Sequence, residues 1–391
     1  MATANNSAAR IHQQHDSSDL EPPGVLARLV ETADVRFNGG RPWDIQVKNR
    51  EIYDRVLHRG SLGFGESFVD GAWDSDRLDQ TFDKLLSANL DRRIKGMAKL
   101  QFLGLFLKSV LFNRQSRARA FQVGEHHYDI GNDVYSAMLD TTMSYSCGYW
   151  KDAENLEEAQ RAKLQLICDK LELEPDQRLL DIGCGWGGLA KFAAENYGVE
   201  VTGITVSKEQ RKLAQERCRG LPVQIELLDY RELDGRFDKV VSVGMFEHVG
   251  PKNYPAYFAA VDRVLADNGL FLLHTIGNYD TLHTTDAWID NYVFPNGKIP
   301  SARQLTRAIE PDFIIEDWHN FGQDYDRTLI AWWHNFDASW PRLADKYGER
   351  FYRMFKYYLN ACAGYFRARQ GQLWQIVLSK RTRRDLYRSI R

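Results

Sequence analysis

Short apolar runs alternate with amphipathic stretches along the middle of the chain. The apolar runs predict strands at residues 178–182, 199–204, 223–228, 239–243 and 269–276. The helical spacing of apolar positions predicts helices at 156–171, 189–197, 208–219 and 254–265. Strands and helices that alternate in this way form right-handed βαβ units. We therefore predict an α/β fold built on a doubly wound, Rossmann-like and mostly parallel sheet.

The flanking segments lack this alternation. Residues 1–22 are polar and are predicted to be disordered. We expect a small N-terminal domain at 23–115, with strands at 35–37 and 45–47, a glycine- and aromatic-rich loop at 60–73 and a helix at 78–86. Residues 116–391 should form the main domain, with a helical segment at 328–365. Within it, 281–330 is predicted to be an irregular, aromatic-rich insertion of the kind that walls an apolar substrate pocket.

A glycine-rich turn follows the first predicted strand of the sheet. Residues 179–188 are Leu-Leu-Asp-Ile-Gly-Cys-Gly-Trp-Gly-Gly, and such a turn lets a ligand approach the backbone closely. The dinucleotide fingerprint G-x-G-x-x-G is also satisfied, because Gly188 stands in the sixth place. The glycines alone therefore leave a nucleotide site open. Asp181, two residues before the first glycine, and the sequence further on indicate S-adenosylmethionine (SAM) instead.

SAM requires three kinds of contact: backbone groups for its amino-acid end, polar side chains for its ribose and an apolar wall for its adenine. The candidates are Gly183, Gly185 and Gly187 for the amino-acid end, Thr205 and Gln210 for the ribose, and Asp229 and Tyr230 for the adenine. All follow predicted strands, so we expect them to converge at the carboxyl edge of the sheet, together with Glu247.

The composition of the chain restricts its possible partners, metal sites and cellular compartment. Apolar residues make up 43% of the chain and the net charge is −2, which argues against a nucleic-acid partner. The five cysteines are widely spaced, with no C-x-x-C pair, so we expect a reducing compartment and no metal site. No run of eighteen apolar residues occurs. We therefore expect a cytoplasmic protein whose membrane contact is peripheral, at the inner membrane face.

Two segments are strongly basic. Residues 91–120 hold eight Lys or Arg residues and one acid, interleaved with Phe and Leu. This pattern is typical of a helix on an anionic membrane surface, and equally of an interdomain helix with solvated cations. The second cluster lies at 380–391, where we expect a solvated tail. Residues 126–129 (His-His-Tyr-Asp) resemble a metal cluster, but a loop that closes over SAM is the favoured interpretation.

Six motifs occur in an order that resembles the cyclopropane fatty acid synthase family. They are Tyr145-Ser146-Cys147-Gly148-Tyr149-Trp150, the glycine turn, Thr205-Val206-Ser207-Lys208-Glu209-Gln210, Val243-Gly244-Met245-Phe246-Glu247-His248-Val249-Gly250, His274-Thr275-Ile276-Gly277 and Asp324-Tyr325-Asp326-Arg327-Thr328. They cover roughly residues 120–370. The mycobacterial members that act on mycolic acids lack an N-terminal domain like residues 20–115. The resemblance is therefore closer to the bacterial branch that acts on membrane phospholipids.

The resemblance implies a SAM-dependent methyltransferase that adds a methylene to the cis double bond of phospholipid acyl chains, with 281–330 walling the acyl chain. It adds Tyr145 and Ser146 to the cofactor site and implies a homodimer. It also implies a bound bicarbonate as the base. The matching positions are the backbone at Cys147 and Ile276, the side chains of His274 and Tyr325, and Glu247 as hydrogen-bond acceptor. Cys362 matches a family cysteine that invites a nucleophile assignment, although a structural role is favoured.

Ordinary structural roles remain open for each residue. Glu247 could cap a helix, His274 could be a core histidine, and Tyr325 and Cys147 could simply be packed; the intact order of motifs favours the site. Other functions also remain: a C-methyltransferase that leaves a methyl-branched lipid, a methyltransferase of a small amine, or a membrane-binding protein with a vestigial methyltransferase fold.

Overall fold

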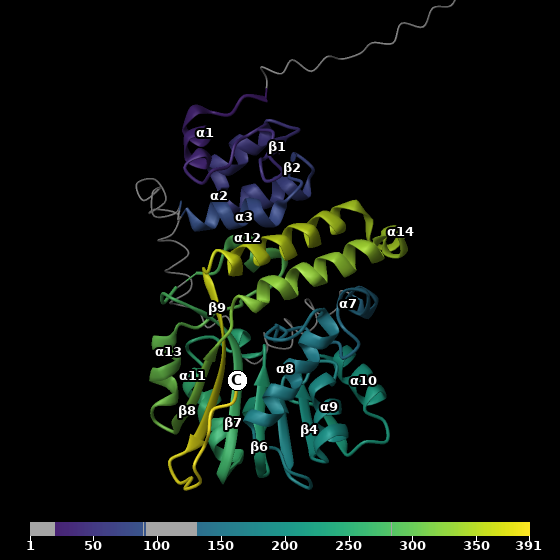
Figure 1. Ribbon diagram of the computed structural model, residues 1–391, viewed down its shortest axis with the longest axis vertical. Helices are drawn as coiled ribbons and strands as arrows, with labels where there is room; N and C mark the ends of the chain where they lie inside the picture. Colours follow the sequence, from purple (N-terminus) through teal and green to yellow (C-terminus); the bar gives the residue numbers. More distant parts are fainter. Residues whose placement is uncertain (1–19, 89, 91–130, 283) are drawn as a thin grey trace, which may run out of the picture.

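The computed structural model describes residues 20–88, 90, 131–282 and 284–391 (Figure 1). Its elements in chain order are α1 (Gly24–Glu31), β1 (Gln46–Val47), α2 (Glu51–Val69), β2 (Trp73–Asp74), α3 (Leu78–Ser87), α7 (Asn132–Met138), α8 (Leu156–Lys170), β3 (Arg178–Ile182), α9 (Gly188–Tyr197), β4 (Glu200–Thr205), α10 (Lys208–Arg217), β5 (Val223–Leu227), η2 (Tyr230–Glu232), β6 (Phe237–Val243), η3 (Phe246–His248), α11 (Tyr254–Val264), β7 (Leu265–Asn278), α12 (Ala287–Tyr292), α13 (Ala302–Ile309), β8 (Phe313–Asn320), α14 (Asp324–Arg367) and β9 (Gly371–Lys380).

Seven strands form one sheet in the order β5-β4-β3-β6-β7-β9-β8. The first five are parallel, whereas β9 runs antiparallel to both β7 and β8. The chain moves outward from β3 to β4 and β5 and then returns to place β6 on the other side of β3. This is the reversal of strand order at which doubly wound sheets bind ligands. The predicted α/β class is confirmed.

Both faces of the sheet are covered, which explains the continuous apolar runs of its strands. On one face, Leu180 and Ile182 of β3 share a buried cluster with side chains of α11 and α13. On the other, Leu179 shares a cluster with side chains of α8 and α9. Successive residues of β3 thus point to opposite layers, as the pleat of a strand requires.

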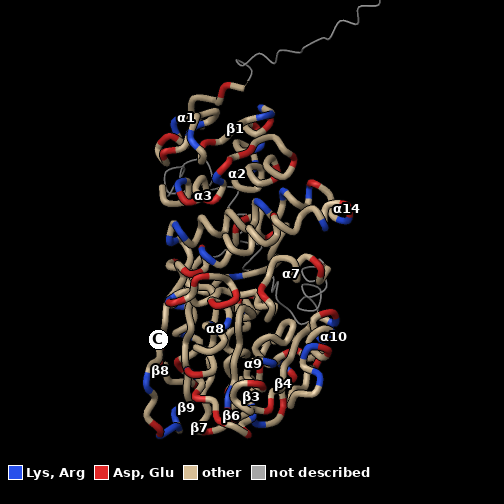
Figure 2. The backbone as a smooth tube through the Cα atoms, turned by 45° about the vertical axis from the view of Figure 1, so that its right-hand side comes forward, with Lys and Arg blue, Asp and Glu red and all other residues tan. Residues whose placement is uncertain are grey.

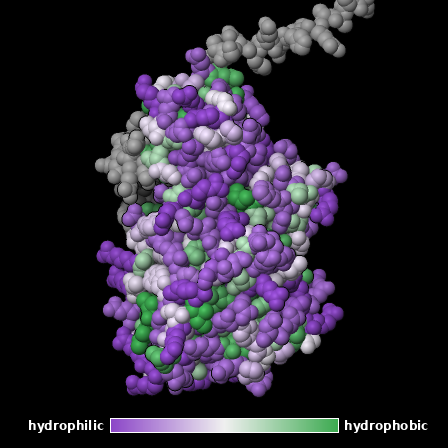
Figure 3. Space-filling view, viewed as in Figure 1, coloured by the Kyte–Doolittle hydropathy of each residue, from purple (hydrophilic) through white to green (hydrophobic). Residues whose placement is uncertain are grey.

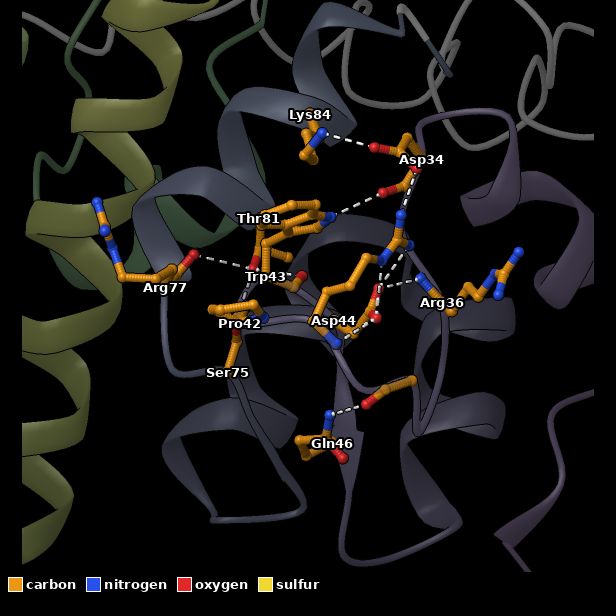
Figure 4. A network of polar contacts seen from close by, with 12 residues as sticks. Asp34, Arg36, Pro42, Trp43, Asp44, Gln46, Ser75, Arg77, Thr81 and Lys84 are labelled. Atoms are coloured by element: carbon orange, nitrogen blue, oxygen red, sulfur yellow. Dashed lines mark hydrogen bonds and ion pairs between the residues drawn. The ribbon is translucent and has the colours of Figure 1, made fainter.

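The N-terminal region packs on α14 through α3 (Figure 1). Figure 4 shows its polar centre, where the buried Asp44 carboxylate accepts backbone hydrogen bonds from Arg36 and Arg41. The cations of Arg41 and Lys84 both contact the indole of Trp43, at 5.2 and 4.5 Å from the ring centre. The segment between α1 and β1 has no regular secondary structure, and these side-chain contacts stabilise it instead.

The predicted details of this region are partly wrong. The helix at 78–86 is confirmed as α3, but 60–69, expected to be a loop, belongs to helix α2 with a break at Gly60. Residues 35–37 contribute only an isolated bridge, from Phe37 to Ile45. Residues 46–47 form β1, which pairs with β2 at 73–74. Gly65 of α2 serves packing, because a Cβ on it would lie 2.4 Å from the Trp288 ring.

Two predictions about the C-terminal half are also wrong. The segment 281–330 is not irregular, since it contains α12, α13 and the edge strand β8, and β9 was missed as well. The tail is not a freely solvated chain. Arg391 pairs with the buried Asp317 of β8, and the nearly buried Arg383 pairs with Glu172. Figure 3 shows hydrophobic side chains over this β8–β9 edge, where Ile314 is 45% exposed.

Several predictions lie outside the described residues: most of the disordered segment, the basic segment 91–120 and the cluster at 126–129. In the backbone view of Figure 2, Lys and Arg residues and Asp and Glu residues are interspersed along the described chain. No helix in the described part of the chain is long and apolar enough to cross a membrane. Among the same residues, no group of His, Cys, Asp and Glu is arranged to hold a metal ion.

Candidate active site

The glycine turn joins β3 to α9 in a conformation that other residues rarely adopt. Gly183 and Gly185 have φ values of +86° and +54°. A Cβ on Gly183 would lie 2.8 Å from the Met245 side chain, so the loop after β6 closes directly on the turn. Gly187 (φ +78°) precedes the first residue of α9 and faces Ala214 of α10 and Cys218, the residue that follows this helix. It therefore shapes the turn.

A pocket opens beside this turn at the carboxyl ends of β3 to β6. Of the residues predicted to bind the cofactor, those that line it are Tyr145, Ser146, Asp181, Gly183, Gly185, Thr205, Gln210, Asp229 and Tyr230. Only Gly187 of the predicted set is absent from the described lining. The lining therefore includes groups for all three parts of SAM: the turn after β3, the polar pair after β4 and the wall after β5.

The polar groups at the ribose and adenine ends are held in place by local hydrogen bonds. The Thr205 hydroxyl donates to Gln210 Oε1 at 2.8 Å, and Ser207 caps α10 by accepting from the Gln210 backbone. The Asp229 carboxylate caps η2 and pairs with Arg231 at 2.9 Å. Tyr230 lies beside it and its buried hydroxyl has no hydrogen-bond partner among the described residues. These residues fit SAM.

Lys163 is a charged pocket residue that the sequence analysis missed. Lys163 lies on the inner face of α8, is only 2% exposed and donates a hydrogen bond to Ser146 Oγ at 3.2 Å. Burial lowers the pKa of Lys163 to about 8, partly offset by nearby carboxylates. Burial raises the pKa of Asp181 to about 7, and the Lys163 charge opposes that rise. The signal was present: position 163 falls on the helix face formed by Leu156, Ala159 and Ile167, where a lysine is unusual.

A second cluster lies where β6 and β7 end. Glu247 projects from η3, and its Oε1 accepts a 2.7 Å hydrogen bond from the Ile276 backbone N–H. Its other oxygen, Oε2, is buried without a partner among the described residues. Burial raises the pKa of Glu247, and the hydrogen bond from Ile276 only partly offsets this. The Ile276 N–H thus orients the acceptor instead of remaining available to an anion.

His274 lies two residues before Ile276 on β7, so both side chains are on the same face of the strand. It is 1% exposed, and burial together with the charges of Lys163 and Lys170 holds its pKa well below the usual value. The imidazole is therefore neutral. Gln375 Nε2 lies 3.3 Å from its Nδ1 and donates to it, which places the proton on Nε2. That Nε2 is buried without a partner among the described residues.

The other predicted site residues gather around Phe321. Cys147 is buried in one small cluster with Phe321 and Leu373, against which Ile276 and Tyr325 pack. The ring of His274 lies 5.9 Å from that of Phe321. Four elements distant in sequence therefore meet here: the loop before α8, η3, β7 and the start of α14. Burial raises the pKa of the Cys147 thiol well above its usual value, so this cysteine is not a thiolate.

Cys362 lies apart, on α14. Burial raises its pKa to about 12, which keeps the thiol protonated at neutral pH and gives it no nucleophilic character. Nearby, the Tyr145 and Tyr358 hydroxyls lie 2.8 Å apart. Both tyrosines line a small aromatic cavity between α7, α12 and α14, whose other lining residues are Tyr135, Tyr292, Val293, Met354 and Phe355. Since Tyr145 lines both cavities, the apolar one adjoins the cofactor pocket.

Known proteins are similar to this chain in sequence and in fold. Residues 115–376 match the family model described as mycolic acid cyclopropane synthetase. The chain is 58% identical over 358 residues to the cyclopropane-fatty-acyl-phospholipid synthase of Escherichia coli, covering 91% of this chain and 93% of that protein. It is 39% identical over 290 residues to a probable fatty acid methyltransferase of Pseudomonas putida, covering 67% and 73% of the two chains. A solved mycolic acid cyclopropane synthase in complex with SAH and CTAB superposes with a TM-score of 0.63 at 32% identity, covering 66% of this chain and 98% of that one.

Proposed function

The chain belongs to the mycolic acid cyclopropane synthetase family, and we infer from this membership that it is a cyclopropane-fatty-acyl-phospholipid synthase. It is a SAM-dependent methyltransferase that transfers a methylene group to the double bond of unsaturated phospholipid acyl chains. The observation that carries this is 58% identity over 91% of the chain, N-terminal region included. The predicted fold, family and enzyme class are confirmed.

SAM supplies an electrophilic methyl group. In the proposed reaction, the π electrons of the alkene form a bond to that methyl carbon while its bond to sulfur breaks, which leaves a carbocation on the acyl chain. A C–H bond of the new methyl group then breaks, its electrons close the three-membered ring, and the proton passes to a base. Aromatic faces suit the cation, and Tyr145, which lines the cofactor pocket, lies with its ring centre 5.2 Å from that of Trp332. Each desolvated cation–π contact contributes about 2 kcal/mol.

The base is proposed to be bicarbonate, held between Glu247 and His274. Two observations support it: the neutral His274 presents an N–H donor and Glu247 presents an acceptor, and both atoms are buried without protein partners in the described part of the chain. An anion that also carries a hydroxyl satisfies both at once. Its hydroxyl donates to Glu247, whose raised pKa suits it to accept a proton. Cys147 and Tyr325 complete the wall of this site.

The test is to incubate the purified protein with SAM and vesicles of unsaturated anionic phospholipid in carbon dioxide-depleted buffer. We expect high-field cyclopropyl proton signals that grow when bicarbonate is added. Retained olefinic signals together with a new methyl signal would refute ring formation and favour a C-methyltransferase. Cyclopropane formation that ignores added bicarbonate would refute the base.

Peripheral membrane binding and a homodimer are part of the proposal. The basic segment 91–120 supports the former, because each cation near an anionic surface contributes about 1 kcal/mol. Neutralising Arg92, Arg93 and Lys95 should reduce sedimentation with anionic vesicles, and unaltered sedimentation would refute the role of this segment. The homodimer is a prediction for sedimentation equilibrium of the full chain.

A further inference from the structure

Two buried side chains of opposite charge line the glycine-turn end of the cofactor pocket. Asp181 belongs to β3 and Lys163 to α8, and each is only 2% exposed. They influence each other electrostatically, yet no ion pair or hydrogen bond joins them among the residues that the structure describes. A buried charge without a partner is costly. Each of these groups is therefore arranged for a counter-charge that comes from outside the protein.

The donors of Lys163 are only partly used. Its ammonium group has three N–H donors, and one of them goes to Ser146 Oγ. The nearby Asp140 carboxylate is engaged elsewhere, because it accepts hydrogen bonds from the backbone of Thr142 and Ser144. In the described part of the chain, the remaining Lys163 donors have no protein acceptor, and Asp181 accepts no side-chain or backbone hydrogen bond.

We propose that Lys163 binds the carboxylate of SAM, on the side of the pocket where Asp181, already predicted to bind the cofactor, carries the charge that complements its ammonium group. The amino-acid end of SAM is a zwitterion, and a buried cation and a buried anion lining one pocket match its two charges. Backbone N–H groups of the glycine turn carry no net charge and cannot make this distinction alone. The proposal rests on the SAM site of the proposed function and adds the residues that select the amino-acid portion of the ligand.

The experiment compares two ligands by calorimetric titration, without lipid. SAH carries the amino-acid end, whereas methylthioadenosine has the same nucleoside and thioether but lacks the carboxylate and ammonium. We expect Lys163→Gln to weaken SAH binding tenfold or more and to leave methylthioadenosine binding within about twofold. Asp181→Asn should show the same selectivity. Lys239→Gln is the matched control: Lys239 is also buried with a pKa lowered to about 8, but it lies outside the described pocket lining.

Two outcomes overturn the proposal: unchanged SAH affinity, or equal losses for both ligands, which would mean that Lys163 only holds the Ser146 loop. If neither variant folds, the wild-type protein decides, because it should bind SAH at least tenfold more tightly than the decarboxylated analogue of SAH; equal affinities overturn the proposal. Selective SAH binding without any cyclopropane product would refute the proposed function and leave this inference standing.

Discussion

Glu247→Gln offers a direct test of the anion site. The amide oxygen can keep the 2.7 Å hydrogen bond from the Ile276 N–H, so the side chain should stay in position. The buried Oε2, however, is replaced by an NH2 group. This group is a hydrogen-bond donor, so it cannot accept the hydrogen bond from the bicarbonate hydroxyl. A hydrogen bond to a charged group contributes about 1.5–3 kcal/mol. About 1.4 kcal/mol corresponds to a tenfold change in affinity. We therefore expect the bicarbonate concentration that gives half-maximal activity to rise about 10- to 150-fold.

The assay measures cyclopropane formation against bicarbonate concentration, with SAH affinity measured in parallel. Glu247 does not belong to the described lining of the cofactor pocket, so SAH affinity should stay within about twofold of wild type. Glu195→Gln is the control, because Glu195 lies on the outer side of α9 and pairs only with the exposed Lys191 within the described contacts. A parallel fall in SAH affinity, or an unchanged bicarbonate dependence, would refute the assignment.

The same geometry gives three further predictions. Tyr325→Phe keeps the ring contact with Phe366, at 4.6 Å between centres, but removes the hydroxyl; turnover should fall by about tenfold with SAH affinity unchanged, and a matching loss of SAH binding would place Tyr325 in the cofactor site. Cys362→Ala should leave turnover within about twofold, because burial keeps this thiol protonated; loss of activity in a folded variant would restore the nucleophile assignment. Burial would raise the pKa of Asp317, but hydrogen bonds from Arg391 and the charge of Lys170 outweigh it and lower the pKa. The pair therefore stabilises the fold above the unfolded pKa of about 4, and this is lost as pH falls through the folded value. Arg391→Ala should reduce the free energy of unfolding by about 1 kcal/mol at pH 7 and by less at pH 3, as followed by urea denaturation; equal losses at both pH values would contradict this.

The sheet could be predicted where local sequence and final environment agree. Residues 178–182 were predicted as a strand and form β3, because a run buried on both faces must be apolar throughout. The same holds for the glycine turn, where positive φ values exclude most side chains. The remaining site residues were predicted from the resemblance of the motifs to the cyclopropane fatty acid synthase family, because local patterns do not specify which loops meet at the sheet edge.

The failures occur where a distant partner decides the structure. Gly63 and Gly65 suggested a loop, but they are in α2, and their missing side chains allow Arg55 and Trp288 to approach. The sequence of β8 was predicted to be irregular. This strand lies at the edge of the sheet, so residues such as Ile314 are exposed, and its pairing with β9 joins segments that are distant in sequence. In each case the residue type reflects a contact with a part of the chain that is distant in sequence. A short stretch of sequence does not contain that partner and so cannot predict the contact.

The loop after β6 explains how one site can serve both a methyl donor and a base. Met245 and His248 line the cofactor pocket, whereas Glu247, between them, is bonded to Ile276 on the opposite side. The single turn η3 produces this division, because neighbouring residues of a tight helix point in different directions. The same few residues would therefore separate the cofactor from the proposed anion. In the proposed reaction, a base bound at Glu247 would lie beside the cofactor pocket and would not compete with SAM for its lining residues.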